Sequence, residues 1–229
     1  MSGIENTLIC RLEKDGEHFE ILVNPKNAYD VKTGVKKDFS NVLAFDEIFE
    51  DANKGERQKG SALKKAFVTE DVQAVARQIF QEGELQLTTE MRRKAVAEKW
   101  ARIIALIAAN VVDPRTKAPH PPNRIEKALE EARFHVDAFK HAEDQMEDAI
   151  ESIREILPIS LEKMRLAVRV PGEFAPKAYG MLKEFGIEKE EWAGDGSLIV
   201  VVSFPAGIQG EFYDRLNRLT GGQSQTKKM

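Results

Sequence analysis

Residues 161–170 read LEKMRLAVRV, and this stretch decides the fold of the last third of the chain. It alternates apolar residues with charged or small ones, a pattern that predicts a strand with one buried face. The buried positions would be Met164, Leu166, Val168 and Val170. Pro171 and Gly172 then turn the chain into a predicted helix over residues 176–185, which Gly186 ends.

The remainder of this segment completes a β-α-β-β-α order. A second strand ends near Trp192, residues 193–196 (AGDG) predict a hairpin, and residues 198–204 (LIVVVSF) predict a buried strand. A second helix is expected over residues 207–219. This order matches a ferredoxin-like split βαβ unit, which needs one more strand. Only residues 221–229 (GGQSQTKKM) remain to supply it, and they predict either an edge strand or a frayed tail.

Residues 88–159 show helical periodicity and no strand pattern. Thr89 can cap the first helix, whose apolar stripe keeps to one face for about six turns. This stripe consists of Val96, Trp100, Ile103, Ile104, Ile107 and Val111. The four prolines in residues 113–122 end that helix. Ile125 and Leu129 mark a second helix and Ile150 and Ile153 a third, so we expect a three-helix bundle.

The first 87 residues predict a mixed α/β domain. Residues 7–12 and 18–23 are two short, partly alternating runs on either side of Lys14-Asp15-Gly16, which is typical of a hairpin. Asn24-Pro25 predicts the start of a helix. Thr69 can cap another helix, which Gly83 would end before a returning strand at residues 84–87.

The spacing of apolar residues thus changes twice along the chain, between a mixed pattern, a helical pattern and a mixed pattern again. These changes predict an α+β multidomain fold with domains at residues 1–87, 88–159 and 160–229. The chain has 42% apolar residues, enough for packed cores, and its single cysteine, Cys10, lies in an apolar run that favours a core position. The longest apolar run, residues 103–109, is too short to cross a membrane, and no targeting segment is visible. We therefore expect a cytoplasmic monomer that does not contact membranes.

Residues 53–71, NKGERQKGSALKKAFVTED, form a basic island in a chain whose net charge is −4. Between Lys54 and Lys65 a single acid, Glu56, accompanies five cations, which are Lys54, Arg57, Lys59, Lys64 and Lys65. Such an island attracts a polyanion to one place without making the whole surface adhesive. The simpler interpretation is a solvated loop that leads into a short amphipathic helix.

No arrangement of residues predicts catalysis. Gly55 and Gly60 have the spacing of a phosphate-binding loop, but Ser61 stands where a lysine is required. The four histidines fall in different elements, and there is no Gly-x-Ser-x-Gly elbow. We therefore expect a protein that is not an enzyme, with no catalytic residues, no metal site and no cofactor.

Basic clusters predict an RNA partner instead. Arg92-Arg93-Lys94 and the cations near the proline-rich turn add to the island, and three clusters in two adjacent domains favour a structured RNA recognised by shape and backbone. The expected RNA-binding residues are Lys37, Lys54, Arg57, Lys59, Lys64, Arg92, Arg93, Arg115 and Lys117. Base-specific recognition is not supported, because no aromatic motif of the RNP type is present.

Several motifs occur in a specific order. The first part contains Lys14-Asp15-Gly16-x-x-Phe19-Glu20-Ile21, Gly34-Val35-x-Lys37-Asp38, Lys54-Gly55, Ala66-Phe67-x-Thr69 and Gly83-Glu84-x-Gln86; further on come Asp113-Pro114-Arg115-Thr116-Lys117-x-Pro119 and Met164-Arg165-Leu166. Together they resemble the Shwachman-Bodian-Diamond syndrome (SBDS) protein family over nearly the whole chain. The chain departs from the family at Asp113, where asparagine is usual, at His120, where an aromatic is expected, and at Val68, where glycine is frequent. None of these departures removes a cation.

The resemblance implies a ribosome maturation factor without an active site of its own. By analogy, the first domain would dock on large-subunit rRNA and the third would meet an elongation-factor-2-like GTPase. Together they would release initiation factor 6 from the large subunit. Two expected hinges, near residues 87–89 and 158–160, would let one domain move while another stays bound. An RNA-processing adaptor that works with an exosome and an unrecognised enzyme are the alternatives.

Overall fold

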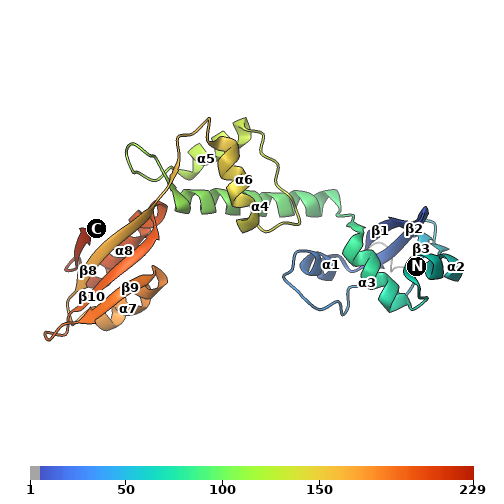
Figure 1. Ribbon diagram of the computed structural model, residues 1–229, viewed down its shortest axis with the longest axis horizontal. Helices are drawn as coiled ribbons and strands as arrows, with labels where there is room; N and C mark the ends of the chain where they lie inside the picture. The colour runs from blue at the N-terminus through green and yellow to red at the C-terminus, as the bar shows by residue number, and fades with distance from the viewer. Residues whose placement is uncertain (1–5) are drawn as a thin grey trace. The chain divides into compact units, whose positions relative to one another are not determined.

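The computed structural model describes residues 6–229 (Figure 1). It consists of two compact units, and each is described by itself. The first unit extends to Glu98 and includes Asp137–His141, and the second comprises Lys99–Val136 and Ala142–Met229. Helices and antiparallel sheets occur in the same chain, which confirms the predicted α+β class. Among the described residues no helix is long and apolar enough to cross a membrane.

The first unit contains a five-stranded antiparallel sheet in the order β4-β3-β2-β1-β5. Its strands are β1 (Leu8–Lys14), β2 (Glu17–Val23), β3 (Phe49–Asp51), β4 (Glu56–Arg57) and β5 (Glu84–Leu85). In the β1–β2 hairpin Lys14 lies opposite Glu17, and the two turn residues Asp15 and Gly16 have φ of 52° and 78°. Positive φ at both positions is the geometry that an Asp-Gly turn favours, so the predicted hairpin is confirmed.

Three helices cover one face of this sheet: α1 (Pro25–Lys32), α2 (Gly60–Phe67) and α3 (Val72–Glu82). Alternate residues of β1 and β2 face them, among them Cys10 and Phe19, both fully buried. The rings of Phe19 and Phe67 meet edge to face with centroids 4.8 Å apart. Cys10 is fully buried, which confirms its predicted core position, and this burial raises the pKa of its thiol to about 11.

Two predicted helix starts need correction by one or two residues. The Asp71 carboxylate accepts the backbone N–H of Gln73 and caps α3, whereas Thr69 accepts from Asp71 outside the helix. The helix α4 (Thr89–Asn110) is likewise capped by Thr88, which accepts the N–H of Met91 at 3.1 Å. Thr and Asp are both favoured at the N-cap, so a sequence with two such residues close together does not show which of them starts the helix.

The second unit begins with the remainder of α4 and two further helical segments. They are α5 (Pro122–Glu131) and α6 (Met146–Ile153), the latter preceded by the 3₁₀ turn η1 (Glu143–Gln145). Ile107, Ile125 and Ile153, one from each helix, are fully buried in a common core. The three predicted helices are therefore confirmed.

The expectation of no strands in this region is wrong. Val111–Val112 forms β6 and pairs antiparallel with β7, Ser160–Leu161. Two-residue strands separated by about fifty positions leave no periodic signal, so the sequence could not show them. The pairing also places Ser160, one end of the second expected hinge, inside the unit rather than in a free linker.

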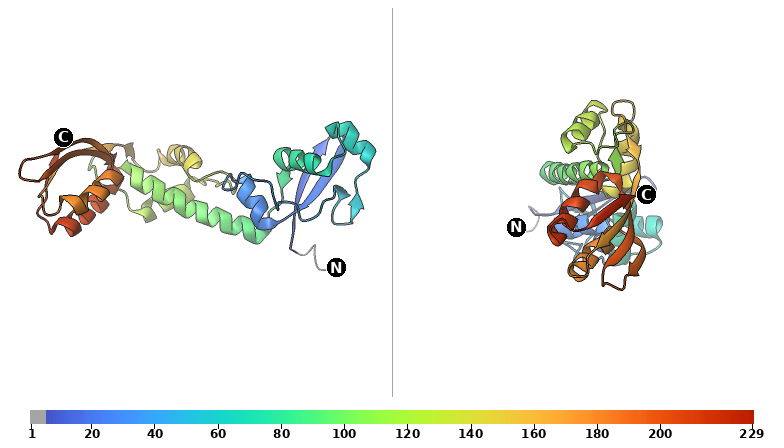
Figure 2. Two further views of the ribbon diagram at one scale, coloured as in Figure 1. Left: turned by 90° about the horizontal axis from the view of Figure 1, so that it is seen from below. Right: turned by 90° about the vertical axis from the view of Figure 1, so that its left-hand side faces the viewer.

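The last part of the chain forms the predicted ferredoxin-like domain. Its elements are β8 (Lys163–Val170), α7 (Ala175–Glu184), β9 (Ile187–Trp192), β10 (Leu198–Pro205), η2 (Ala206–Ile208), α8 (Gln209–Thr220) and β11 (Gln225–Lys228). The sheet order is β11-β8-β10-β9, and α7 and α8 lie together on one of its faces (Figure 2). Residues 225–228 thus supply the missing fourth strand, as an edge strand rather than a frayed tail.

Candidate nucleic-acid interface

The basic island, residues 53–71, begins in the turn between β3 and β4 and continues through α2. Gly55 in this turn has φ 72°, a left-handed conformation that glycine adopts without strain. The buried carboxylate of Glu20 on β2 anchors the turn, because it accepts the backbone N–H of Ala52 at 2.8 Å and pairs with Arg11. The sheet therefore fixes where the island lies.

Nearby carboxylates hold three of the island's cations. The pairs are Lys54 with Asp51 at 3.0 Å, Arg57 with Glu47 at 2.5 Å and Lys64 with Glu70 at 3.2 Å. All three pairs lie at the surface, where an ion pair contributes little to stability. A phosphate can take the place of each carboxylate, but it must first displace that carboxylate.

The contact between Lys54 and Asp51 changes the pKa of both groups. Their hydrogen bond raises the pKa of the Lys54 ammonium and lowers the pKa of the Asp51 carboxyl. The two shifts have the signs expected of an ion pair at the surface. Asp51 and Lys54 are three residues apart, so their ion pair could have been predicted from the sequence. The ion pair of Arg57 with Glu47 could not, because it depends on how the chain folds back.

Lys59 differs from these residues. It immediately precedes α2, is exposed, and its side chain has no ion pair or hydrogen bond within the described part of the chain. Lys65 on α2 reaches the backbone carbonyl of Asp15 at 3.5 Å, away from the Lys64 pair, so adjacent helix positions point in different directions. Lys59 is therefore the most available of the cations predicted within the island.

Three more predicted cations of the first unit are also exposed. Lys37 lies in the loop after α1, where its neighbour Lys36 instead donates to the Ser40 carbonyl at 2.9 Å. Arg92 and Arg93 lie near the start of α4. Over residues 6–229 the structure gives the side chains of Lys37, Arg92 and Arg93 no ion pair. Their charges are available to an external anion.

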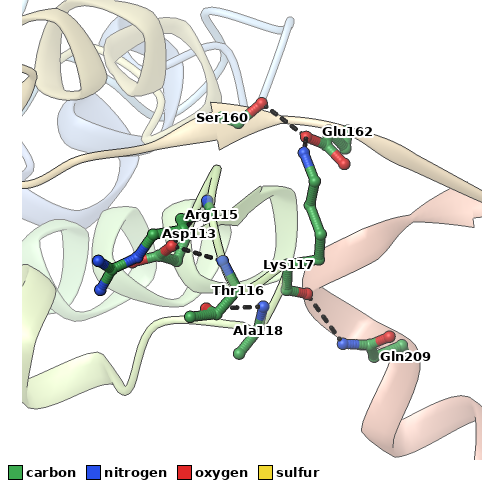
Figure 3. A network of polar contacts seen from close by, with 8 residues as sticks. All are labelled: Asp113, Arg115, Thr116, Lys117, Ala118, Ser160, Glu162 and Gln209. Carbon is green, nitrogen blue, oxygen red and sulfur yellow. Dashed lines mark hydrogen bonds and ion pairs between the residues drawn. The ribbon is translucent and has the colours of Figure 1, made fainter.

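The loop that follows β6 is held by its own polar contacts (Figure 3). The Asp113 carboxylate accepts the backbone N–H groups of Arg115 and Thr116, both at 2.9 Å, and these bonds lower its pKa. The Arg115 side chain extends away from this network. This loop therefore presents Arg115 to solvent from a backbone that these hydrogen bonds hold.

Lys117, by contrast, belongs to a structural link within the second unit. Its ammonium pairs with Glu162 at 2.6 Å, and Ser160 donates to the same carboxylate at 3.0 Å (Figure 3). The bond from Lys117 lowers the pKa of Glu162. Gln209 at the start of α8 donates to the Lys117 carbonyl at 3.4 Å. Lys117 thus connects the loop that follows β6 with the ferredoxin-like domain.

The structure therefore divides the nine predicted RNA-binding residues into two groups. Those already paired with a carboxylate are Lys54, Arg57, Lys64 and Lys117. Those whose side chains have no ion pair within the described chain are Lys37, Lys59, Arg92, Arg93 and Arg115. Arg115 and Lys117 belong to the second unit and the other seven to the first, so the nine do not form one cluster inside a single unit.

The histidines and carboxylates do not form a candidate metal centre in the described residues. No group of three or more His, Cys, Asp or Glu side chains there could hold a metal ion. His120 is buried, and its Nε2 lies 2.9 Å from the Pro158 carbonyl, which is a structural contact. The basic residues thus remain the candidate functional site.

Comparison with known protein families covers nearly all of the chain. Residues 6–93 match the Shwachman-Bodian-Diamond syndrome (SBDS) N-terminal domain. Residues 101–162 match SBDS protein, domain II, and residues 164–229 match the SBDS protein C-terminal domain. Every predicted RNA-binding residue falls within the first two of these matches.

Three relatives show how far the similarity extends. The Ribosome maturation protein SDO1 homolog of Methanothermobacter thermautotrophicus is 44% identical over 230 residues, which cover 99% of each chain. The homolog of the same name in Aeropyrum pernix is 39% identical and covers 99% of this chain and 98% of its own. Ribosome maturation protein SBDS of Caenorhabditis elegans is 32% identical over 97% of this chain and 88% of its own.

Proposed function

This chain belongs to the SBDS protein family, as its motifs predicted, and on that premise we propose that it is a ribosome maturation factor. It binds large-subunit rRNA and, with an elongation-factor-2-like GTPase, promotes release of initiation factor 6 from the large subunit. It acts in the cytoplasm, as a monomer and without catalysis of its own. The names of relatives that align over almost their full length support the maturation role.

One observation carries the RNA-binding part of the proposal. The chain has a net charge of −4, yet five of the predicted cations are exposed and have no carboxylate partner within the described residues. Phosphate neutralisation supplies most of the affinity of a protein for RNA backbone, and an available cation supplies it without first giving up a partner. Lys37, Lys59, Arg92, Arg93 and Arg115 should therefore contribute more than Lys54, Arg57 and Lys64.

The test compares two triple variants in binding to purified large subunits over a range of salt concentrations. We expect Lys59→Ala, Arg92→Ala and Arg93→Ala together to weaken binding, most strongly at low salt. The plot of log affinity against log salt concentration should become less steep, its negative slope shrinking by about 0.7 to 0.9 for each phosphate that the variant no longer neutralises. The control is Lys127→Ala, Lys177→Ala and Arg218→Ala, which removes three exposed cations that we did not predict to bind RNA.

Equal salt slopes for the two variants would contradict the assignment of these residues to the RNA interface. Release of labelled initiation factor 6 from large subunits, with and without the purified GTPase, tests the second part of the proposal. We expect release only when the protein, the GTPase and GTP are all present. Sedimentation with a purified exosome, and not with large subunits, would instead favour an RNA-processing adaptor.

A further inference from the structure

A polar pocket of about 420 Å³ lies within the first unit, between α3 and the loop that joins α1 to β3. Residues of the loop between Asp38 and Asp46 form one wall, and Gln73 and Arg77 on α3 form the other. We call it the loop–helix pocket. Its volume falls within the range of small-ligand sites. The pocket lies outside the basic island, so the assignment of that island does not account for it.

Hydrogen bonds hold both walls of the loop–helix pocket in place. The side-chain amide of Asn27 on α1 donates to the backbone carbonyl of Asn41 at 2.9 Å. The side-chain amide of Gln73 on α3 donates to the carboxylate of Asp46 at 2.6 Å. These contacts join the loop to two helices that pack on the sheet of the first unit. A site that is formed before its ligand arrives loses less conformational entropy on binding.

Arg77 and Phe39 give the pocket a flat surface. The central carbon of the Arg77 guanidinium lies over the Phe39 ring, 5.6 Å from its centroid. Phe39 in turn meets Phe80 edge to face, with centroids 5.3 Å apart. Arg77 is exposed and has no ion pair within the described residues. A guanidinium plane of this kind is a surface on which unpaired RNA bases stack.

Hydrogen-bonding groups without partners line the remainder of the pocket. Gln73 donates to one oxygen of Asp46, which leaves the second Asp46 oxygen and the Gln73 side-chain carbonyl without a partner in residues 6–229. The side-chain amide of Asn41 has no hydrogen bond in the same part of the chain either. The pocket thus offers two neighbouring acceptors and an amide that both donates and accepts.

The charges of the pocket disfavour two classes of ligand. Asp38 and Asp46 repel a phosphate, and Arg77 repels a cationic side chain. A neutral, planar ligand that donates and accepts hydrogen bonds meets neither obstacle, and a nucleobase has these properties. Lys37, which is exposed and predicted to bind RNA, directly precedes Asp38, so a phosphate next to such a base has a cation at the rim.

We propose that the loop–helix pocket binds one unpaired guanine of the RNA partner. Guanine presents two adjacent donors, N1–H and N2–H₂, which match the open oxygen of Asp46 and the carbonyl of Gln73. Its O6 accepts from the Asn41 amide, and its ring stacks on Arg77. Adenine, cytosine and uracil do not present two adjacent donors. The inference rests on the proposed function and adds base-specific recognition, which the sequence did not predict because the pocket is not an RNP motif.

The first test measures affinity for two short RNA oligonucleotides, oligouridine and the same chain with one central guanosine. The unaltered protein should bind the guanosine chain about fivefold more tightly. Asp46→Asn, which turns the open acceptor into a donor, and Arg77→Lys, which keeps the charge but not the plane, should each bind the two chains equally. The control is Glu13→Gln, which removes an exposed carboxylate from β1 and should keep the preference.

The second test uses purified large subunits and kethoxal, which modifies N1 and N2 of unpaired guanines. The unaltered protein and the Glu13 control should protect a guanine that stays reactive when Asp46→Asn is bound. This comparison separates base recognition from charge, because both variants lose one carboxylate and should gain equally in their attraction to RNA backbone.

Three results would overturn the inference and leave the proposed function intact. They are equal affinity of the unaltered protein for the two oligonucleotides, identical kethoxal protection by the Asp46 and Glu13 variants, and tighter binding of free arginine than of guanosine monophosphate. The last result would mark the pocket as a site for cationic side chains. Failure of the unaltered protein to bind large subunits would instead refute the proposed function.

Discussion

At the scale of single residues, Val68 combines two unfavourable features. It ends α2 with φ 62° and ψ 6°, a left-handed conformation, and its side chain is 90% exposed. A β-branched residue is strained in this conformation, and no packing compensates for the strain. Glycine at this position would remove the strain, because it adopts the left-handed conformation without a steric cost.

We expect Val68→Gly to stabilise the first unit by about 0.5 to 1 kcal/mol, the relief of strain less the entropy that glycine adds to the unfolded chain. Hydrogen exchange of the slowest amides in β1 and β2 measures the change. Val35→Gly is the control, because Val35 is also exposed, at 73%, but its φ is not positive. A gain in both variants would show that strain at Val68 is not the cause.

The island shows what could be predicted at this scale. The sequence shows which cations cluster, because charge is a property of each residue. It does not show that Glu47, far from Arg57 along the chain, neutralises it, because that contact requires the fold of β3 and β4. Prediction from sequence therefore found candidate residues but could not rank them, whereas the structure favours Lys59.

At the scale of elements, the helix α3 is held at its C-terminal end by a side chain from α1. The Lys32 ammonium donates to the carbonyls of Phe80, Gln81 and Gly83 at 2.7, 3.3 and 2.9 Å. The last carbonyls of a helix have no hydrogen-bond donor within the helix, and they carry partial negative charge. A lysine ammonium group donates hydrogen bonds to these carbonyls and also offsets their charge. This contact joins two helices that pack on the same sheet.

We expect Lys32→Met, which keeps the stem and removes the charge, to destabilise the first unit by about 1.5 to 3 kcal/mol. Exchange of the α3 amides should increase most. Lys37→Met, in the loop that follows the same helix, removes an exposed lysine without a described partner and should change stability by less than about 0.5 kcal/mol. Equal effects of the two substitutions would mean that the carbonyl contacts do not stabilise α3.

Elements with a strong side-chain pattern were predicted correctly, and those made by backbone pairing alone were not. The alternation in β8 and the Asn24-Pro25 start of α1 are visible in the sequence. The strand β11 is exposed along its whole length and is held by its backbone bonds to β8, so its residues carry no apolar pattern. The strands β6 and β7 were missed for a different reason, because strands of only two residues leave no periodic signal in the sequence.

At the scale of the whole molecule, the second unit joins the ferredoxin-like domain to the end of α4 by close backbone contact. A Cβ atom added at Gly207 would lie 2.3 Å from the Ala108 carbonyl oxygen and 2.4 Å from that of Ala109. Both atoms belong to the helix backbone and cannot move aside as a side chain can. The pair of Lys117 with Glu162 reinforces the same joint.

We expect Gly207→Ala to open this joint while the cores on either side stay folded, because the clash lies between them. Proteolysis and hydrogen exchange should increase near residues 158–162, and the amides of β8 and β10 should keep their protection. Gly210→Ala, three residues later in α8, is the matched control, since nothing lies within 4 Å of a Cβ atom added there. Unchanged exchange near residues 158–162 in the Gly207 variant would show that the joint does not depend on this contact.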